Sequence, residues 1–167
     1  MINSLGDLFS SFSPEMATIF LALLPFTELR AALPLSITVF YLNPFSAYFF
    51  SVIGNVIPVF FILWGLPSLL LFAEKHSPQL QHFFEKHVYS LEKKHEKKYQ
   101  RYGRFVLFVF TAIPLPVSGV WTASILAVLF HIERKYAFIA ITLGMLTAGL
   151  IVLLIVTGVL EGLSFLL

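Results

Sequence analysis

The sequence predicts an all-α integral membrane protein made of two inverted repeats, each a re-entrant helical hairpin followed by a transmembrane helix. Hydrophobic residues make up 58% of the 167 positions and charged residues only 12%, against roughly 25% charged residues in a soluble domain. Four apolar segments, at 17–42, 45–73, 105–130 and 136–160, each exceed the roughly 20 residues that a helix needs to cross a bilayer. Helix breakers and the distribution of basic residues separate the first and third segments from the other two.

The first segment contains "LPFTELRAALPL" (24–35), in which Pro25 and Pro34 flank the charged residues Glu28 and Arg30. A proline inside a helix costs about 3 kcal/mol and removes a backbone donor. We therefore expect 17–42 to be a hairpin that dips into the membrane and turns within "PFTELR" (25–30).

The third segment contains "IPLPVSG" (113–119), which places Pro114, Pro116 and Gly119 within seven residues. An unbroken helix is not expected there, because each X-Pro residue also avoids the helical region. We expect 103–130 to be a second hairpin. Segments 45–73 and 136–160 have fewer breakers and are expected to span the membrane, the first of them with a kink.

The basic residues support the same division. The connection at 74–102 carries seven Lys and Arg against four Glu, and "HIERK" (131–135) carries two against one. The positive-inside rule places both connections in the cytoplasm, which requires 103–130 to enter and leave on one side. The connection 74–102 reads as a Lys-rich amphipathic helix on an anionic leaflet or, equally, as a solvated linker helix. Its histidines lack the i, i+4 spacing of a helical zinc site, so no metal or other cofactor is expected.

Glu28 and Arg30 are the candidate site because a charge at membrane depth is costly and by default marks a function. In the functional interpretation Glu28 binds a proton or cation and Arg30 holds an anionic group such as phosphate. In the alternative, the two charges only hold the hairpin in place. On one helix, residues two apart would point in nearly opposite directions, whereas an unwound turn could aim both the same way. Asn55 is either a substrate contact or an interhelical hydrogen bond.

The spacing of breakers predicts the repeat. Pro25 precedes Gly54 by 29 residues, and Pro114 precedes Gly144 by 30. Inverted repeats with broken helices that meet at the midplane are a common construction of secondary transporters. We expect Glu28 and Arg30 to face "IPLPVSG", where Ser118 and Gly119 are small enough for close approach. The helix expected to start after Arg30 would offer free N–H groups to an anion.

Three motifs in order, "PFTELRAALPLSI", "GNVIP" and "TAIPLPVSGVWTASILAVLF", resemble the small multi-drug export protein family of prokaryotic membranes. That family is in turn similar to the DedA and VTT-domain proteins, to which paired re-entrant hairpins and movement of lipids or lipid-linked carriers are attributed. The second hairpin here departs from DedA proteins by lacking an Arg or acid at its turn. Ser118 stands where the small multi-drug export family more often has a small turn residue such as Gly or Thr. The resemblance implies functional roles for these matching positions: Glu28, Arg30, Pro34, Asn55, Pro114, Pro116, Gly119, Trp121 and Thr122.

The resulting expectation is a small transporter of an amphiphilic or lipid-linked, phosphate-bearing substrate, with protons or cations as possible coupling ions. The alternatives are a lipid scramblase or flippase, a scaffold without transport, and, as a competing fold, an antiporter of four plain helices. Trp121 and Thr122 either pack against neighbouring helices or line a substrate cavity.

An enzyme is not expected, because the apolar segments hold no histidine and Glu28 is their only carboxylate. Membrane lipids are the expected partners, nucleic acid is not, and a homodimer in the inner (plasma) membrane is expected.

Overall fold

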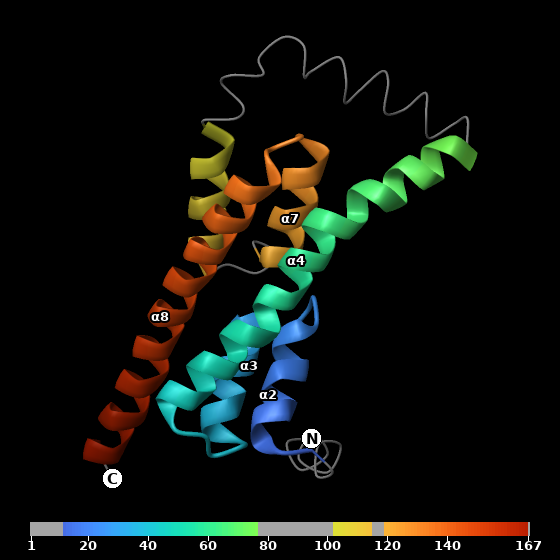
Figure 1. Ribbon diagram of the computed structural model, residues 1–167. Coiled ribbons are helices and arrows are strands. Elements are labelled where there is room, and N and C mark those ends of the chain that lie inside the picture. The colour runs from blue at the N-terminus through green and yellow to red at the C-terminus, as the bar shows by residue number, and fades with distance from the viewer. Residues whose placement is uncertain (1–11, 77–101, 115–118, 167) are drawn as a thin grey trace.

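The computed structural model describes residues 12–76, 102–114 and 119–166, and all regular structure in these ranges is α-helical (Figure 1). Six helices lie within them: α2 (Pro14–Leu23), α3 (Glu28–Thr38), α4 (Pro44–His76), a helix at Tyr102–Ala112 that we call the 102–112 helix, α7 (Val120–Leu129) and α8 (Arg134–Leu166). The predicted all-α class is therefore confirmed for the described part of the chain. Most of the basic connection 74–102 lies outside it.

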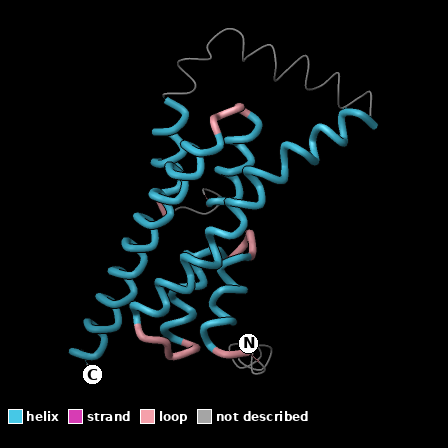
Figure 2. Tube along the Cα trace, viewed as in Figure 1, coloured by secondary structure: helices cyan, strands magenta, loops and turns pink. Residues whose placement is uncertain are grey.

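Two pairs of short helices form antiparallel hairpins. The turn 24–27 joins α2 to α3, and both outer ends of this pair lie at the end of the molecule near the N-terminus (Figure 2). The 102–112 helix and α7 form the second pair, whose outer ends lie at the opposite end of the molecule. The ends of all four short helices that adjoin the two turns, which we call their inner ends, lie near the middle of the molecule. α2, α3 and α7 have 10, 11 and 10 residues, about half of a membrane span. Among the described residues, only α4 and α8 are long and apolar enough to cross a membrane, which does not match four plain spanning helices.

The prolines of the two predicted hairpins do not all end a helix. α2 ends at Leu23, two residues before Pro25, and the 102–112 helix ends just before Pro114, as predicted. Pro34, in contrast, lies inside α3 without ending it, so its assignment as a breaker was wrong. Neighbouring helices can offset the hydrogen bond that such a proline removes, and α3 continues for one further turn after Pro34, to Thr38.

The two long helices repeat at an interval of 90 residues. α4 begins at Pro44 and α8 at Arg134, and each has 33 residues. The loop before each helix contains one non-glycine residue with positive φ, Tyr41 at 55° and His131 at 51°, again 90 apart. The pattern of buried and exposed positions along 51–60 is identical to that along 141–150. α8 extends beyond both predicted ends of segment 136–160.

Each long helix packs on the first helix of a hairpin through one glycine. A β-carbon on Gly54 would clash with the backbone of Ile19 and the side chain of Ala22 in α2. A β-carbon on Gly144 would clash with Phe108 and Thr111 of the 102–112 helix. The two glycines are 90 positions apart and the residues they meet are 89 apart, so the same close packing occurs in both halves.

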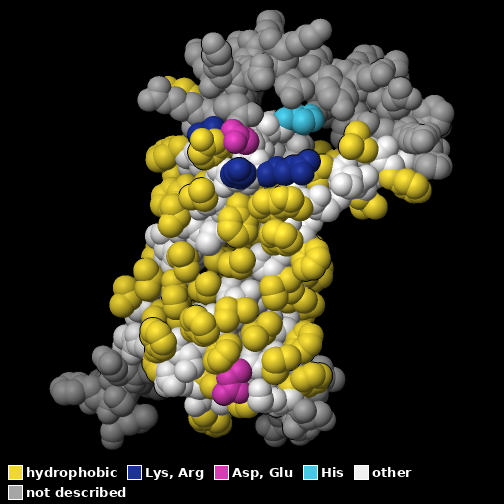
Figure 3. Space-filling model, in the orientation of Figure 1, with side chains coloured by type: hydrophobic (Ala, Val, Ile, Leu, Met, Phe, Trp, Pro, Cys, Tyr) yellow, Lys and Arg dark blue, Asp and Glu magenta, His cyan; other side chains and the backbone are white. Residues whose placement is uncertain are grey.

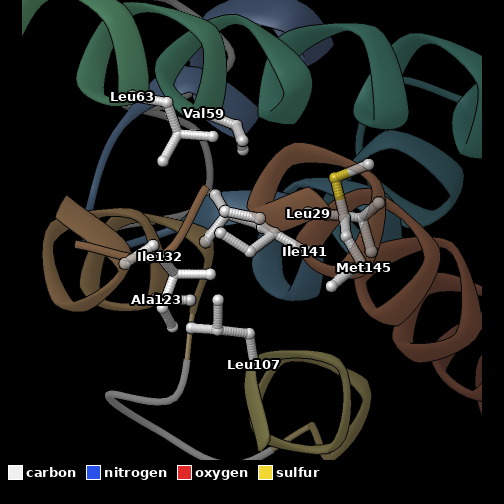
Figure 4. Packing of buried hydrophobic residues seen from close by; sticks show 12 residues of the cluster. Leu29, Val59, Leu63, Leu107, Ala123, Ile132, Ile141 and Met145 are labelled. Atoms are coloured by element: carbon white, nitrogen blue, oxygen red, sulfur yellow. The ribbon is translucent and has the colours of Figure 1, made fainter. Parts of the chain in front are cut away.

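The core lies between the second helices of the hairpins and the two long helices. Figure 4 shows Leu29 of α3 beside Ile141 and Met145 of α8, with Val59 and Leu63 projecting from α4. On the face shown in Figure 3 the surface is hydrophobic between a group of Lys, Arg, His and acidic side chains at one end and an acidic residue at the other. Only a third of the most apolar stretch of α4 and of α8 is buried inside the protein. The rest is suited to contact lipid.

Candidate functional site

Glu28 is the first residue of α3, and its side chain reaches the second hairpin. The residue has a φ of 47°, a left-handed conformation that costs about 1–3 kcal/mol for a residue with a side chain. Its side chain is buried, with 7% exposure. The carboxylate accepts hydrogen bonds from the backbone N–H groups of Trp121 and Val120, the first residues of α7. Glu28 thus caps a helix that lies 92 positions away in the chain.

Gly119 makes this contact possible. It is the N-cap residue of α7 and has no side chain to satisfy the helix's first N–H groups. A β-carbon built at Gly119 would lie within bonding distance of both oxygens of the Glu28 carboxylate. Glycine is therefore required at this position by close approach, because its φ of −85° is open to any residue. The first N–H groups of α7 are therefore capped by the Glu28 carboxylate of the first hairpin.

Arg30 lies one helical half-turn further along α3 and contacts the opposite side of the break in the second hairpin. Its guanidinium Nη2 donates to the carbonyl oxygens of Thr111 at 3.4 Å and Ile113 at 3.2 Å. These carbonyls are at the C-terminal end of the 102–112 helix, where the last four carbonyls lack intrahelical partners. The side chain is partly buried.

The second hairpin also donates a hydrogen bond to the first hairpin. The indole Nε1 of Trp121 donates to the carbonyl oxygen of Leu23 at 3.2 Å, and Leu23 is the last residue of α2. In each hairpin, therefore, the second helix provides a side-chain donor to the C-terminal carbonyls of the other hairpin's first helix. We call this set of contacts, made by Glu28, Arg30 and Trp121, the hairpin junction.

Helix dipoles explain why the two charges can be buried in an apolar protein. The N-terminus of α7 carries a partial positive charge and faces the carboxylate, while the C-terminus of the 102–112 helix carries a partial negative charge and faces the guanidinium. Such interactions contribute up to about 2 kcal/mol each in partly buried geometry. The broken helix of one hairpin thus supplies partners for both charges of the other.

The structure corrects the predicted local geometry of the charged pair. Glu28 and Arg30 do not lie in an unwound turn, because the turn is 24–27 and both residues belong to the first turn of α3. Accordingly, the helix does not start after Arg30 but includes it. The two side chains contact opposite sides of one break, as expected for positions two apart on a helix.

The other predicted residues divide into three groups. Gly119 and Trp121 are at the hairpin junction, and Pro114 follows Ile113, whose carbonyl Arg30 contacts. Asn55 is buried in α4, and Thr122 is partly buried in α7. Pro116 and Ser118 lie outside the described residues.

Sequence reasoning missed the carbonyls of Leu23, Thr111 and Ile113, since a backbone acceptor leaves no signal in the sequence. It also missed the buried hydrogen bond between Thr18 Oγ1 and Ser36 Oγ, 2.7 Å long, which joins α2 to α3. Two hydroxyls 18 positions apart in an apolar segment could have suggested that contact. Within the described ranges, no group of three or more His, Cys, Asp or Glu could hold a metal ion.

Comparison with known protein families shows which family the chain belongs to. The family model described as "Putative small multi-drug export protein" matches residues 28–151, which are 124 of the 167 residues and include Glu28, Arg30 and the whole break of the second hairpin. The chain belongs to this family. No curated protein and no solved structure matches it. Family membership and the two long apolar helices together indicate a membrane protein.

Proposed function

We propose that this member of the small multi-drug export family is a membrane transporter whose two hairpins enter the bilayer from opposite sides and meet at its midplane. The observation that carries the proposal is the hairpin junction: Glu28 and Arg30 lie between the inner ends of four half-length helices. The correspondence of α4 and α8 at an interval of 90 residues supports two inverted repeats. Discontinuous helices of inverted repeats commonly form the substrate site of secondary transporters.

The substrate is proposed to be an amphiphilic or lipid-linked molecule with a phosphate or similar anionic group. The N-terminus of α7 is an anion site by its free N–H groups and its dipole, and the Glu28 carboxylate fills it at present. An incoming phosphate could take the place of this carboxylate, with the planar guanidinium of Arg30 as its second partner. Substrate binding would then break the contact between the hairpins, which couples binding to their movement.

The same geometry supports a lipid scramblase as the second candidate function. Arg30 is only partly buried, and its contact with Ile113 is on the exposed side of the junction, so a lipid headgroup could reach the guanidinium from the bilayer. In this case the headgroup passes between the hairpins without a coupling ion. A non-transporting scaffold, in which the charges only clamp the hairpins, is the third reading. We further propose an inner-membrane location with the 74–102 and 131–135 connections in the cytoplasm, no enzymatic activity, and a homodimer.

Transport by the purified protein in liposomes tests the proposal and separates the candidates. A fluorescent lipophilic cation and a phospholipid with a labelled headgroup serve as the two substrates. Movement of the phosphate-bearing headgroup should require Arg30 in both candidates. In the transporter it should also require Glu28 and respond to an imposed ion gradient, whereas in the scramblase it should need no gradient. The lipophilic cation shows whether an amphiphile without a phosphate group is carried as well, and its export should require Glu28. Movement of neither substrate above protein-free liposomes would leave the scaffold reading and reject transport of both substrate types.

A further inference from the structure

Two buried oxygens on α4 have no hydrogen-bond partner. The hydroxyl Oγ of Ser51 and the amide Oδ1 of Asn55 lie one helical turn apart, on side chains with 0% and 2% exposure. Burying a polar group without a hydrogen-bond partner is costly, and an explanation such as a bound water or ion is expected for each one. Because positions i and i+4 share one face of a helix, the two side chains lie next to each other on the same side of α4.

The Ser51 hydroxyl differs from most other helical hydroxyls of this protein. Six of them donate to the carbonyl four residues earlier in their own helix or its N-terminus, the common way for Ser and Thr to satisfy themselves in an apolar helix. These are Thr18, Ser36, Thr38, Thr111, Thr147 and Thr157. Ser51 has a carbonyl at the same relative position and does not use it, so its oxygen is available to another partner.

The fold itself does not require polar groups at these two positions. Ser51 and Asn55 correspond to Ile141 and Met145 at the 90-residue interval, and the pattern of burial around them is the same. Ile141 and Met145 are ordinary core residues, with 0% and 2% exposure. Apolar residues therefore fill this site in one half of the molecule, and the polar residues in the other half serve a purpose besides packing.

The packing of α4 against α7 links the pair to the hairpin junction. Ser51, Asn55, Val59 and Leu63 follow one another at intervals of four along α4, and Val59 and Leu63 belong to the core cluster that contains Val120 of α7. α4 and α7 pack side by side (Figure 1). Asn55 is one turn before Val59, toward the middle of the molecule, where α7 begins. Glu28, the one carboxylate buried in the described part of the chain, is bound at that same end of α7.

We propose that Ser51 Oγ and Asn55 Oδ1 bind a small hard cation of the Na⁺ type, with the Glu28 carboxylate as its counter-charge. Hydroxyl, amide and carboxylate oxygens are the ligands that hard cations take. A cation in this apolar interior needs a nearby negative charge, which Glu28 supplies without leaving the junction. The inference rests on the proposed function, in which this cation is the coupling ion. Its binding beside Glu28 would weaken the hold of the carboxylate on α7 and so link the ion to the movement of the hairpins.

Ion-specific stabilisation of the purified full chain in detergent tests the site without any transported substrate. Its thermal unfolding is measured in NaCl and in choline chloride at the same concentration, so that ionic strength is constant. A ligand that binds the folded state raises Tm in proportion to the logarithm of its concentration once it exceeds Kd. We expect Na⁺ to raise Tm of the wild type by a few degrees, roughly 2–6 °C at saturating salt, and ²²Na⁺ to bind at a stoichiometry of about one per chain.

The variants copy residues that the fold already accepts. Ser51→Ile and Asn55→Met install the residues of the corresponding α8 positions, so both should fold, and both should lose the Na⁺-specific shift and ²²Na⁺ binding. Thr142→Val is the matched control: it removes another hydroxyl without a partner and installs the residue of the corresponding position, Val52. It should keep the full shift. Asn55→Asp retains an oxygen ligand and adds charge, so its Na⁺ dependence should be retained or stronger, even if Asn55→Met proves unstable.

Equal Tm of the wild type in NaCl and choline chloride, or an unchanged shift in both apolar variants, would overturn the cation site and leave a bound water as the partner of the two oxygens. This result is distinguishable from failure of the proposed function. A chain that transports substrate without Na⁺-specific stabilisation refutes the ion site alone. A chain that binds Na⁺ through Ser51 and Asn55 but moves neither liposome substrate refutes the transport of those substrates alone.

Discussion

The carboxylate of Glu28 lies directly over the α-carbon of Gly119, in the space that a side chain at this glycine would occupy. One residue carries the buried negative charge of the first hairpin, and the other begins the second helix of the second hairpin. The contact therefore makes the position of one hairpin depend on that of the other. Any substitution that keeps the two residues apart should separate the hairpins at the middle of the molecule without changing either hairpin itself.

Gly119→Ala and Gly119→Leu should reduce transport about as strongly as loss of Glu28, because the new β-carbon displaces the carboxylate from the N–H groups of α7. A misplacement of this size at a functional site can cost about 100-fold in rate. Gly65→Ala is the matched control, since Gly65 lies in α4 with open space around it. Initial rates in liposomes, with membrane insertion checked by protease protection, provide the measurement. Equal activity of the Gly119 variants and the Gly65 control would contradict a role for this contact.

Glu28→Gln separates a functional carboxylate from a structural clamp. The amide oxygen of Gln can still accept hydrogen bonds from Val120 and Trp121, so Tm should fall by only a few degrees, corresponding to about 1 kcal/mol. Transport that depends on the negative charge should nevertheless fall at least about tenfold. Glu28→Ala removes the acceptor as well and should destabilise by about 1–3 kcal/mol more.

A Glu28→Gln variant that unfolds like Glu28→Ala yet transports at the wild-type rate would identify the charge as a clamp. The two measurements, unfolding in detergent micelles and transport in liposomes, therefore have to be made on the same preparations. Glu15→Gln is a suitable control, because Glu15 lies at the outer end of α2 and has no contact with the junction in the described structure.

The break of the second hairpin and the position of the charged pair could be predicted from sequence because each rests on a strong local cost. Pro114 and Pro116 cannot both continue a helix, and the 102–112 helix does end just before them. Buried charges need polar partners, and a broken helix provides them. The 90-residue interval was already visible in the similar spacing of Pro25–Gly54 and Pro114–Gly144.

The turn of the first hairpin was predicted within 25–30, but it ends at Thr27, and Pro34 lies inside α3 without ending it. A proline's effect depends on whether the surrounding helices can compensate for the lost hydrogen bond, which sequence alone does not reveal. The sequence also did not predict that Glu28 has a positive φ and is the first residue of α3. The hydrogen bond from Trp121 to Leu23 depends on where two helices 98 positions apart come to lie, and no local pattern encodes it.

Arg30 and Trp121 should act together as the two reciprocal donors of the hairpin junction. Trp121→Phe keeps the ring but removes the N–H, and should destabilise the protein by about 1 kcal/mol. Arg30→Ala leaves the carbonyls of Thr111 and Ile113 without their donor and should cost about 2–3 kcal/mol. Because both contacts hold the same two hairpins together, the double variant should lose less than the sum, by about 0.5 kcal/mol or more.

Denaturant unfolding of the four proteins in mixed micelles measures this double-mutant cycle. Arg30→Lys is informative beside it, because an ammonium cannot reproduce the planar fork that reaches two carbonyls. Strict additivity of Arg30→Ala and Trp121→Phe would show that the two halves of the junction form independently.

Gly54 and Gly144 should respond alike to enlargement if the two halves of the molecule are built in the same way. Gly54→Val would push α4 away from Ile19 and Ala22 of α2, and Gly144→Val would push α8 away from the 102–112 helix. Overpacking of this kind costs about 1–3 kcal/mol. Gly158→Val is the control, because nothing lies near Gly158. A large effect at one of the first two positions and none at the other would contradict the correspondence.

The direction in which the hairpins enter the membrane can be tested with introduced cysteines, since the chain contains none of its own. Single cysteines at Asn43, Ser90 and Glu133 are labelled in intact cells, or in inverted vesicles, with a membrane-impermeant maleimide. Two hairpins that enter from opposite sides place Ser90 and Glu133 on one face and Asn43 on the other. The excess of Lys and Arg around Ser90 and Glu133 predicts that their face is cytoplasmic.

In the structure the start of α8 and the start of α4 lie at opposite ends of the molecule (Figure 1), as this topology requires. Labelling of Ser90 and Glu133 from opposite sides would mean that 103–130 crosses the membrane, and the proposed meeting of two hairpins at the midplane would be wrong.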